Sequence, residues 1–133
     1  MKMFFKNLIL FSVLLVGLSG NAAPKPDMKL PLPGQTLANV KLQSDTLIPV
    51  YVSASRFAMK SCDAMSITDT KVTKKPHNLK SQNGTYIAGE WEERWTVFAC
   101  GSHIYVPVKF ILDSTGATYV IHPDKISVTH PMN

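Results

Sequence analysis

The side chains most able to do chemistry lie in the stretch Glu90–Gly101, where glutamates alternate with tryptophans. Glycosidases use two carboxylates that face each other across the substrate. If this stretch is a strand, Glu90 and Glu92 stand on the same face and do not oppose each other. No serine lies in a nucleophile-elbow pattern either. We therefore expect a protein that is not an enzyme and has no catalytic residue, with a hydrolase as the less favoured alternative.

Metal binding is the second chemistry that the side chains could support, because exported copper proteins use histidine and methionine ligands. The candidates are His77, His103, His122 and His130, with Met28, Met59, Met65 and Met132. No two histidines stand at the spacing of a metal site. We therefore predict no metal ligand and no cofactor, and periplasmic copper or zinc binding stays as the alternative function.

The alternation of side chains in a strand divides the same stretch into two faces. Trp91, Glu93 and Trp95 share the more apolar face, where a carboxylate is costly unless it is paired. Three interpretations stay open for Glu93. A bulge turns it outward, a lysine or arginine pairs with it, or it lines an acidic ligand-binding strip between the two tryptophans on a half-covered face.

The other face carries Phe98 and Tyr105, which we expect to oppose each other across a hairpin, with Arg94 close by. This surface is either covered by a further strand or free to contact a partner or a second copy of the chain. The candidate binding residues are therefore Trp91, Glu93, Arg94, Trp95, Phe98 and Tyr105.

Basic residues gather in a polar segment that we expect to be a loop. They are Lys71, Lys74, Lys75 and Lys80, around His77. Such a loop is either simply solvated or contacts anionic glycans or lipid headgroups. The formal net charge of the whole chain is +5, and it falls to +3 once Lys2 and Lys6 are removed with a signal peptide. That excess is too small to argue for a nucleic acid partner.

A central β-hairpin, residues 90–113, is the element that must position these groups. Its second half has an apolar row on the even positions: Ile104, Val106, Val108, Phe110 and Leu112. This row shares a face with the tryptophans if opposed residues sum to 203, so that Ala99 faces Ile104. A two-residue turn at Gly101–Ser102 or a four-residue loop over residues 100–103 gives that register. Pro107 favours the longer loop, because its missing N–H then points away from Thr96.

The other segments are typical of short strands joined by turns. Strands are expected over residues 36–42, 45–55, 62–73, 85–88, 117–121 and 126–128, with a helical turn at 56–60 and a loop at 74–82. Asn83–Gly84 and Asp113–Gly116 are the turn signals, and Gly89 allows a bend or bulge. Six to eight short strands predict an all-β fold, an antiparallel immunoglobulin-like sandwich with one disulfide.

The start of the chain is expected to be a targeting segment. Residues 1–6 are basic, residues 7–18 are apolar and residues 19–23 are small, which is the pattern of a secretory signal peptide that ends at residue 22. An uncleaved membrane anchor is less favoured, because the apolar stretch falls short of the ~20 residues of a membrane span. Residues 23–35 then form a proline-rich extended arm with weak order, with docking of Leu30 and Leu32 on the body as the alternative, and residues 36–133 form a single β-sandwich domain.

An exported chain with two cysteines most simply joins them, which predicts a disulfide between Cys62 and Cys100. Closing the loop between them should stabilise the fold by roughly 3–4 kcal/mol in the loop-entropy account.

The central residues also carry a resemblance. The runs Gly89–Val97, Cys100–Gly101, Val106–Phe110 and Asp113–Gly116 are similar to a W-E-x-x-W-x-V-x-x-C-G … V-P-V-x-F pattern of small exported gammaproteobacterial proteins, including those of Legionella-like bacteria. The resemblance covers the central part of the chain only. It implies a periplasmic or secreted location and an all-β domain, and it transfers no catalytic residue.

A signal peptide, a disulfide-linked β-domain and surplus aromatic side chains on the hairpin together favour a non-enzymatic periplasmic or secreted binding protein. The expected partner is a protein or glycan ligand, or a second copy of the chain in a homodimer. We expect no nucleic acid partner and no transmembrane segment after signal removal.

Overall fold

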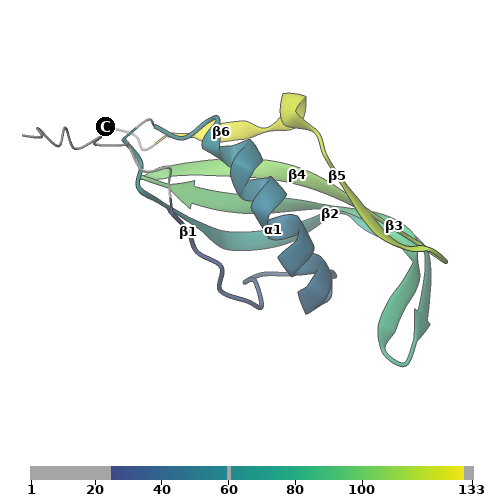
Figure 1. The fold of residues 1–133 in the computed structure, drawn as a ribbon. Helices are drawn as coiled ribbons and strands as arrows, with labels where there is room; N and C mark the ends of the chain where they lie inside the picture. The colour runs from purple at the N-terminus through teal and green to yellow at the C-terminus, as the bar shows by residue number, and fades with distance from the viewer. Residues whose placement is uncertain (1–24, 60, 131–133) are drawn as a thin grey trace, which may run out of the picture.

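The computed structural model describes residues 25–59 and 61–130, so the expected signal peptide lies outside the described residues. The elements are β1 (Lys25–Pro26), α1 (Val40–Ser55), β2 (Ala64–Gln82), β3 (Thr85–Ala99), β4 (Ser102–Asp113), β5 (Gly116–Ile121), the 3₁₀ helix η1 (Pro123–Lys125) and β6 (Ser127–Thr129). The strands form one six-stranded sheet in the order β1-β2-β3-β4-β5, with β6 also paired to β4 (Figure 1). All pairs are antiparallel except β1 with β2.

Residues 40–55 form a helix, where the sequence analysis expected strands over 36–42 and 45–55. The side chain of Asn39 caps the helix by accepting a hydrogen bond from the Leu42 amide at 2.9 Å. Its buried residues recur at helical spacing: Leu42, Gln43, Thr46, Leu47, Val50, Tyr51 and Ala54. The alternation of side chains over residues 47–54 favoured a strand in the sequence, with Pro49 at its edge or in its first residues. Burial of this stripe against the sheet outweighs the hydrogen bond that Pro49 removes, and a helix results.

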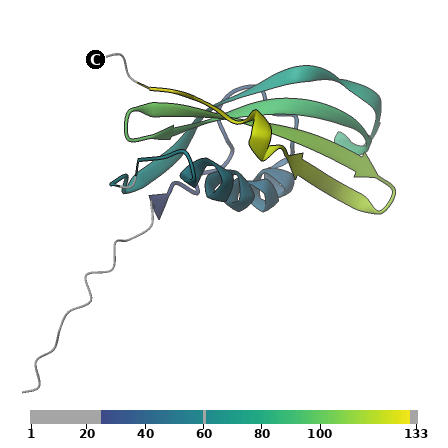
Figure 2. The same ribbon diagram turned by 90° about the horizontal axis from the view of Figure 1, so that it is seen from above.

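The helix lies across one face of the sheet, as Figure 2 shows from above. The core between them combines apolar side chains of α1, β2, β3 and β4. The fold is mostly antiparallel sheet, as predicted. In the described ranges, however, α1 stands where the expected sandwich would have its second sheet, because residues 40–55 bury their apolar stripe as a helix.

The β3–β4 hairpin has the predicted faces but a different register. Opposed residues sum to 201 rather than 203, so Val97 faces Ile104 and Trp91 faces Phe110. The turn is Cys100–Gly101, with φ of 47° and 82°, as a type I′ turn requires. It is neither of the two expected loops. A turn centred on Cys100 was not expected, because cysteine rarely adopts a positive φ. A shift of two residues keeps each side chain on its expected face.

Pro107 fits the hairpin for the reason that the sequence suggested, although the loop is shorter than expected. Counting out from the Cys100–Gly101 turn places Pro107 in a non-hydrogen-bonded pair with Arg94. On its other side, β5 pairs with β4 from Val108 onward and β6 pairs with residues 103–105. Pro107 lies in the gap between them, so its missing N–H interrupts no strand pairing.

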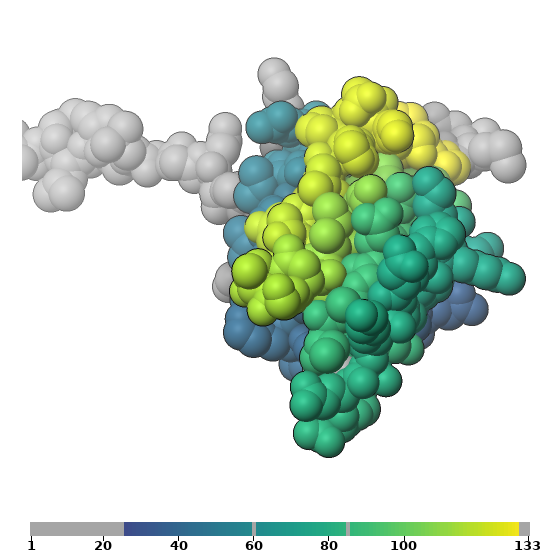
Figure 3. Space-filling model, turned by 90° about the vertical axis from the view of Figure 1, so that its right-hand side faces the viewer, coloured from purple at the N-terminus to yellow at the C-terminus, as the bar shows by residue number. Residues whose placement is uncertain are grey.

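Residues 74–88, which we call the arm, project from the body as the end of the β2–β3 hairpin (Figure 3). Residues 74–82 were expected to be a loop and are strand. The predicted turn at Asn83–Gly84 is present, with φ of 51° and 76°. Pairing between β3 and β4 begins only at Gly89, whose φ is 126°, so the arm leaves the sheet at the glycine where a bend was expected.

Residues 27–37 are held against the body, whereas the proline-rich N-terminal segment, residues 23–35, was expected to be weakly ordered. The Gln35 amide donates to the Thr70 carbonyl at 2.7 Å, and the Thr70 hydroxyl donates to the Pro33 carbonyl at 2.6 Å. Leu32 is 8% exposed. A Cβ on Gly34 would overlap the backbone of Thr70, so only glycine allows this close approach.

The predicted disulfide between Cys62 and Cys100 is present, with Cα atoms 5.6 Å apart. It ties the segment before β2 to the β3–β4 turn. No helix among the described residues is long and apolar enough to cross a membrane.

Candidate binding surface

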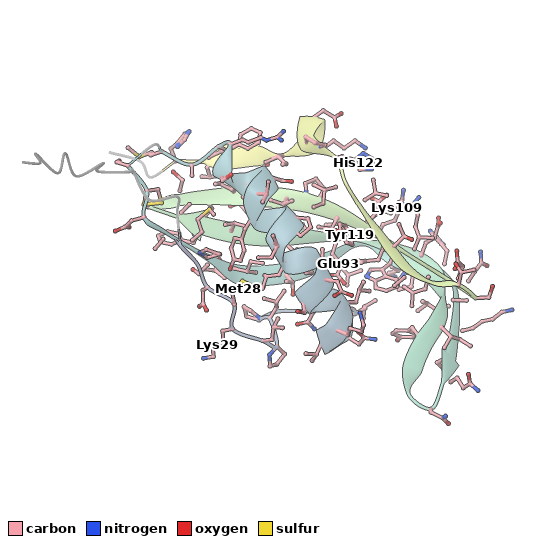
Figure 4. All side chains as sticks on the ribbon, viewed as in Figure 1. Met28, Lys29, Glu93, Lys109, Tyr119 and His122 are labelled. Carbon is pink, nitrogen blue, oxygen red and sulfur yellow. A yellow bond between two sulfur atoms is a disulfide. The ribbon has the colours of Figure 1, made fainter. Side chains whose placement is uncertain are left out.

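Glu93 is fully buried in the core, on the face of β3 that α1 covers (Figure 4). Its Oε1 accepts hydrogen bonds from Trp91 Nε1 at 2.7 Å and from the Leu37 amide at 2.8 Å. Its Oε2 accepts from Trp95 Nε1 at 2.7 Å. Three N–H donors thus satisfy an acceptor-only carboxylate without a cation.

This arrangement differs from all three interpretations of Glu93. The side chain stays on the covered face, none of the ion pairs in the described ranges involves it, and Trp91 and Trp95 are 1% and 0% exposed. These three candidate binding residues therefore belong to the core. The signal that could have revealed this is the placement of two indole donors two residues either side of one carboxylate, on the same strand face.

The other candidates lie on the opposite side of the sheet, which we call the open face. It consists of Glu90, Glu92, Arg94, Thr96 and Phe98 of β3, His103, Tyr105, Pro107, Lys109 and Ile111 of β4, and their partners on β2 and β5. In the described part of the chain, no helix packs on this face. It is the surface that a ligand can reach.

Arg94 stacks on Tyr105, with its guanidinium carbon 4.8 Å from the ring centroid. A cation over an aromatic face is attracted by the ring quadrupole. The Arg94 Nε is buried and has no hydrogen-bond partner among the described atoms. The stack therefore holds a guanidinium in place on the open face, beside Glu92 on the same strand face.

Phe98 is 37% exposed and packs against His103, with ring centroids 5.2 Å apart. The expected partner was Tyr105, and the register shift of two residues is the reason for the difference. Phe98 also lines a shallow hollow of about 550 Å³ beside Cys100 and Ser66. This end of the open face is aromatic and lies next to the disulfide.

The basic residues of β2 form a regular feature that the sequence analysis missed. Lys71, Lys74, His77 and Lys80 recur every third residue, whereas their partners Arg94, Glu92, Glu90 and Ala88 recur every second residue. Each step therefore contains one extra residue of β2, a β-bulge. Because cross-strand partners share a face, the side chains of Lys71, Lys74 and His77 lie on the open face, and Lys80 continues their spacing on the arm, beyond the bend at Gly89. We call Lys71, Lys74, His77 and Lys80 the basic row.

A period of three does not match a regular strand, and this is why the segment was interpreted as a loop. All four side chains of the basic row are exposed. The spacing of three residues between these basic side chains was visible in the sequence. It agrees with a strand only because each step of three residues contains a bulge.

Acidic residues partly balance the basic row. Lys74 Nζ lies 3.6 Å from Glu92 Oε1, and Lys109 Nζ lies 3.7 Å from Glu90 Oε1. With His77 these four residues line a small hollow of about 90 Å³. Lys71 and Lys80 make no ion pair within the described ranges. Four cations on the open face stand against three carboxylates, which leaves it slightly positive: Lys71, Lys74, Arg94 and Lys109 against Asp69, Glu90 and Glu92.

A separate hollow of about 260 Å³ lies where residues 27–33 meet Tyr51 and Ile67. The Tyr51 hydroxyl donates to the Asp27 carbonyl at 2.7 Å and accepts from the Ile67 amide at 3.2 Å. Burial raises the pKa of Tyr51 to about 12, because the charged phenolate would lose its hydration. The hydroxyl therefore stays protonated at neutral pH and tethers the N-terminal segment.

No group of three or more histidine, cysteine, aspartate and glutamate side chains in the described ranges is arranged so that it could hold a metal ion. A copper or zinc site that uses histidine and methionine stays a prediction.

Comparison of the chain with protein-family models, curated proteins and solved structures finds no match. The function is therefore argued from the geometry of the open face.

Proposed function

We propose that the chain is a non-enzymatic binding protein, periplasmic or secreted, and that the open face is its binding surface. The observation that carries the proposal is that α1 covers one face of the sheet, while the other presents a stacked Arg94, Tyr105 and an exposed Phe98. Aromatic residues and arginine are enriched in binding interfaces, where they contribute much of the binding energy.

The disulfide supports a location outside the cytoplasm, because such bonds persist in oxidising compartments. The expected signal peptide points the same way. A non-enzymatic role also agrees with the core position of Glu93. This fully buried carboxylate already accepts hydrogen bonds from three N–H donors and is therefore not free to react with a substrate.

Site-specific photo-crosslinking in the producing cells tests this proposal, because it captures whatever molecule occupies the surface. A photoreactive residue in place of Phe98 or Tyr105 should give discrete adducts. The matched control places it at Ile48 or Val52, which are 47% and 54% exposed on the outer side of α1. Control positions should give no adduct above background.

The mass of the adducts identifies the kind of occupant. A species of twice the mass indicates a homodimer, a defined heavier band indicates another protein, and a polydisperse smear indicates a glycan. Equal yields from Phe98 and Ile48, or no adduct from either open-face position, would contradict the proposal.

A further inference from the structure

We infer that the occupant of the open face is an anionic polysaccharide that lies along the basic row, an inference that rests on the proposed binding function. Successive members of the row face β3 residues that are two positions apart. Two strand residues span about 7 Å, so the row presents a basic side chain at about 7 Å intervals over about 20 Å. An evenly spaced array of this kind suits a flexible polymer with an anionic group on each repeat.

The row is accessible along its length. Among the described residues, β1 pairs with the outer edge of β2, and the backbone amides of Asp27 and Gln35 donate hydrogen bonds to it. These contacts reach only as far as Thr70. From Lys71 onward, β2 is an edge strand among the described elements. A polymer can therefore lie along the row without displacing any described part of the chain.

The rest of the open face fits a sugar polymer as well. Arg94 and Lys109 add cations next to the row. Phe98 continues the face toward the disulfide, and its ring, which is 37% exposed, offers apolar surface for the face of a sugar ring. A planar lipid surface fits less well, because the sheet twists and the arm leaves it at Gly89.

Lysines and bulges have a second use, since they also protect a free edge from pairing with another strand. That role requires charge on the edge but does not require the charges to share a face. The two roles are therefore separated by moving a lysine to the other face while the net charge stays constant.

The test is a titration of the full exported protein with polygalacturonate, which carries a carboxylate on each sugar. Neutral dextran and phosphatidylglycerol vesicles serve as comparison probes. The variant K71Q/K74Q/K80Q should lose about tenfold or more in affinity, and wild-type binding should weaken as salt rises. The matched control K29Q/K41Q/K125Q removes the same charge from exposed positions outside the open face and should change the affinity less than about twofold.

A second variant keeps the net charge of the chain and the number of lysines on the free edge of β2. Exchanging Lys71 with Val72 moves a lysine off the open face while it stays on the edge of β2, because Lys71 pairs with Arg94 on the open face and Val72 pairs with Glu93 on the covered face. This exchange variant should bind polygalacturonate about threefold or more weakly than the wild type, because the row loses one of its cations. Wild-type affinity in the exchange variant would overturn the inference.

Other results would also overturn it: equal loss in both triple variants, equal binding of neutral dextran, or binding of vesicles without polygalacturonate. Failure of this inference is distinct from failure of the proposed function. If Phe98 crosslinks form while polygalacturonate does not bind, the open face still binds a partner and only the polysaccharide assignment fails.

Discussion

Glu93 fits the core only as an acceptor of hydrogen bonds, and Glu93→Gln tests this. The amide group would turn an N–H₂ toward either Trp95 Nε1 or the pair of Trp91 Nε1 and the Leu37 amide, all of which are donors. A buried donor without an acceptor costs about 1–3 kcal/mol, so we expect the free energy of unfolding to fall by about 2 kcal/mol or more.

Urea unfolding measures this loss. The matched control is Glu92→Gln, which changes a partly exposed neighbour whose pair with Lys74 is worth about 1 kcal/mol at most. If the two variants lose the same stability, the acceptor role of Glu93 is wrong.

Tyr51 should make stability depend on pH in the alkaline range. Its pKa rises from 10.0 to about 12 on folding. Between these values the folded state keeps a proton that the unfolded state has lost, so the free energy of unfolding falls as pH rises. The contribution is fully present below pH 10 and lost by about pH 12, and it amounts to at most ~3 kcal/mol.

Tyr51→Phe removes the titrating group together with its hydrogen bonds to Asp27 and Ile67. Wild type should be the more stable protein at neutral pH, and its advantage should shrink between about pH 10 and pH 12. Urea unfolding of both proteins at matched pH values cancels the background from lysine titration. A constant difference across this range would rule out the raised pKa as its cause.

At the scale of elements, the sequence predicted faces better than it predicted registers or element types. The alternation of Trp91, Trp95 and Val97 with polar neighbours placed β3 correctly. Its pairing with β4 was displaced by two residues, because a shift of two preserves the same pattern of buried faces. Register depended on whether Cys100 could adopt a positive φ, which local propensity does not indicate.

The predictions for the helix and for the basic row were wrong for opposite reasons. In residues 45–55, alternate and helical spacing fit the same apolar residues, so the pattern could not separate the two. In residues 71–80 neither period fitted, because three bulges reset the alternation. The periodicity of the sequence therefore revealed neither element.

The docking of the N-terminal segment gives a prediction at this scale. Gly34→Ala should destabilise the fold more than Gly84→Ala does. Both glycines have positive φ, 98° and 76°, so both alanines strain the backbone by about 1–2 kcal/mol. Only at Gly34 would the added Cβ overlap backbone atoms, those of Thr70, whereas nothing lies within 4 Å at Gly84.

Urea unfolding compares the two variants, and limited proteolysis reports whether residues 27–37 detach. Gly34→Ala should lose about 2 kcal/mol more than Gly84→Ala and be cleaved within this segment. Equal stability with no new cleavage would show that the segment is not held as described.

For the whole molecule, the sequence predicted a mostly antiparallel sheet with one disulfide, since two cysteines allow a single pairing. It did not predict what covers the sheet. A sheet needs an apolar layer on one face, and either a second sheet or a helix can supply it. The choice depends on residues 40–55, where the local pattern was ambiguous, so the error in one element changed the expected architecture.

The disulfide gives the prediction that involves the whole fold. The double variant C62A/C100A should lose roughly 3–4 kcal/mol in the free energy of unfolding, because the two cysteines are 38 residues apart and the bridge restricts the unfolded chain.

Loss of the bridge should not weaken polygalacturonate binding well below the melting temperature. The bridge ties the Phe98 end of the open face, whereas the basic row lies along β2 from Lys71 to Lys80. Urea unfolding and the polygalacturonate titration, both run on the same double variant, check the two parts separately. A large loss of affinity in the folded double variant would show that the polymer binds at the disulfide end instead of along the basic row.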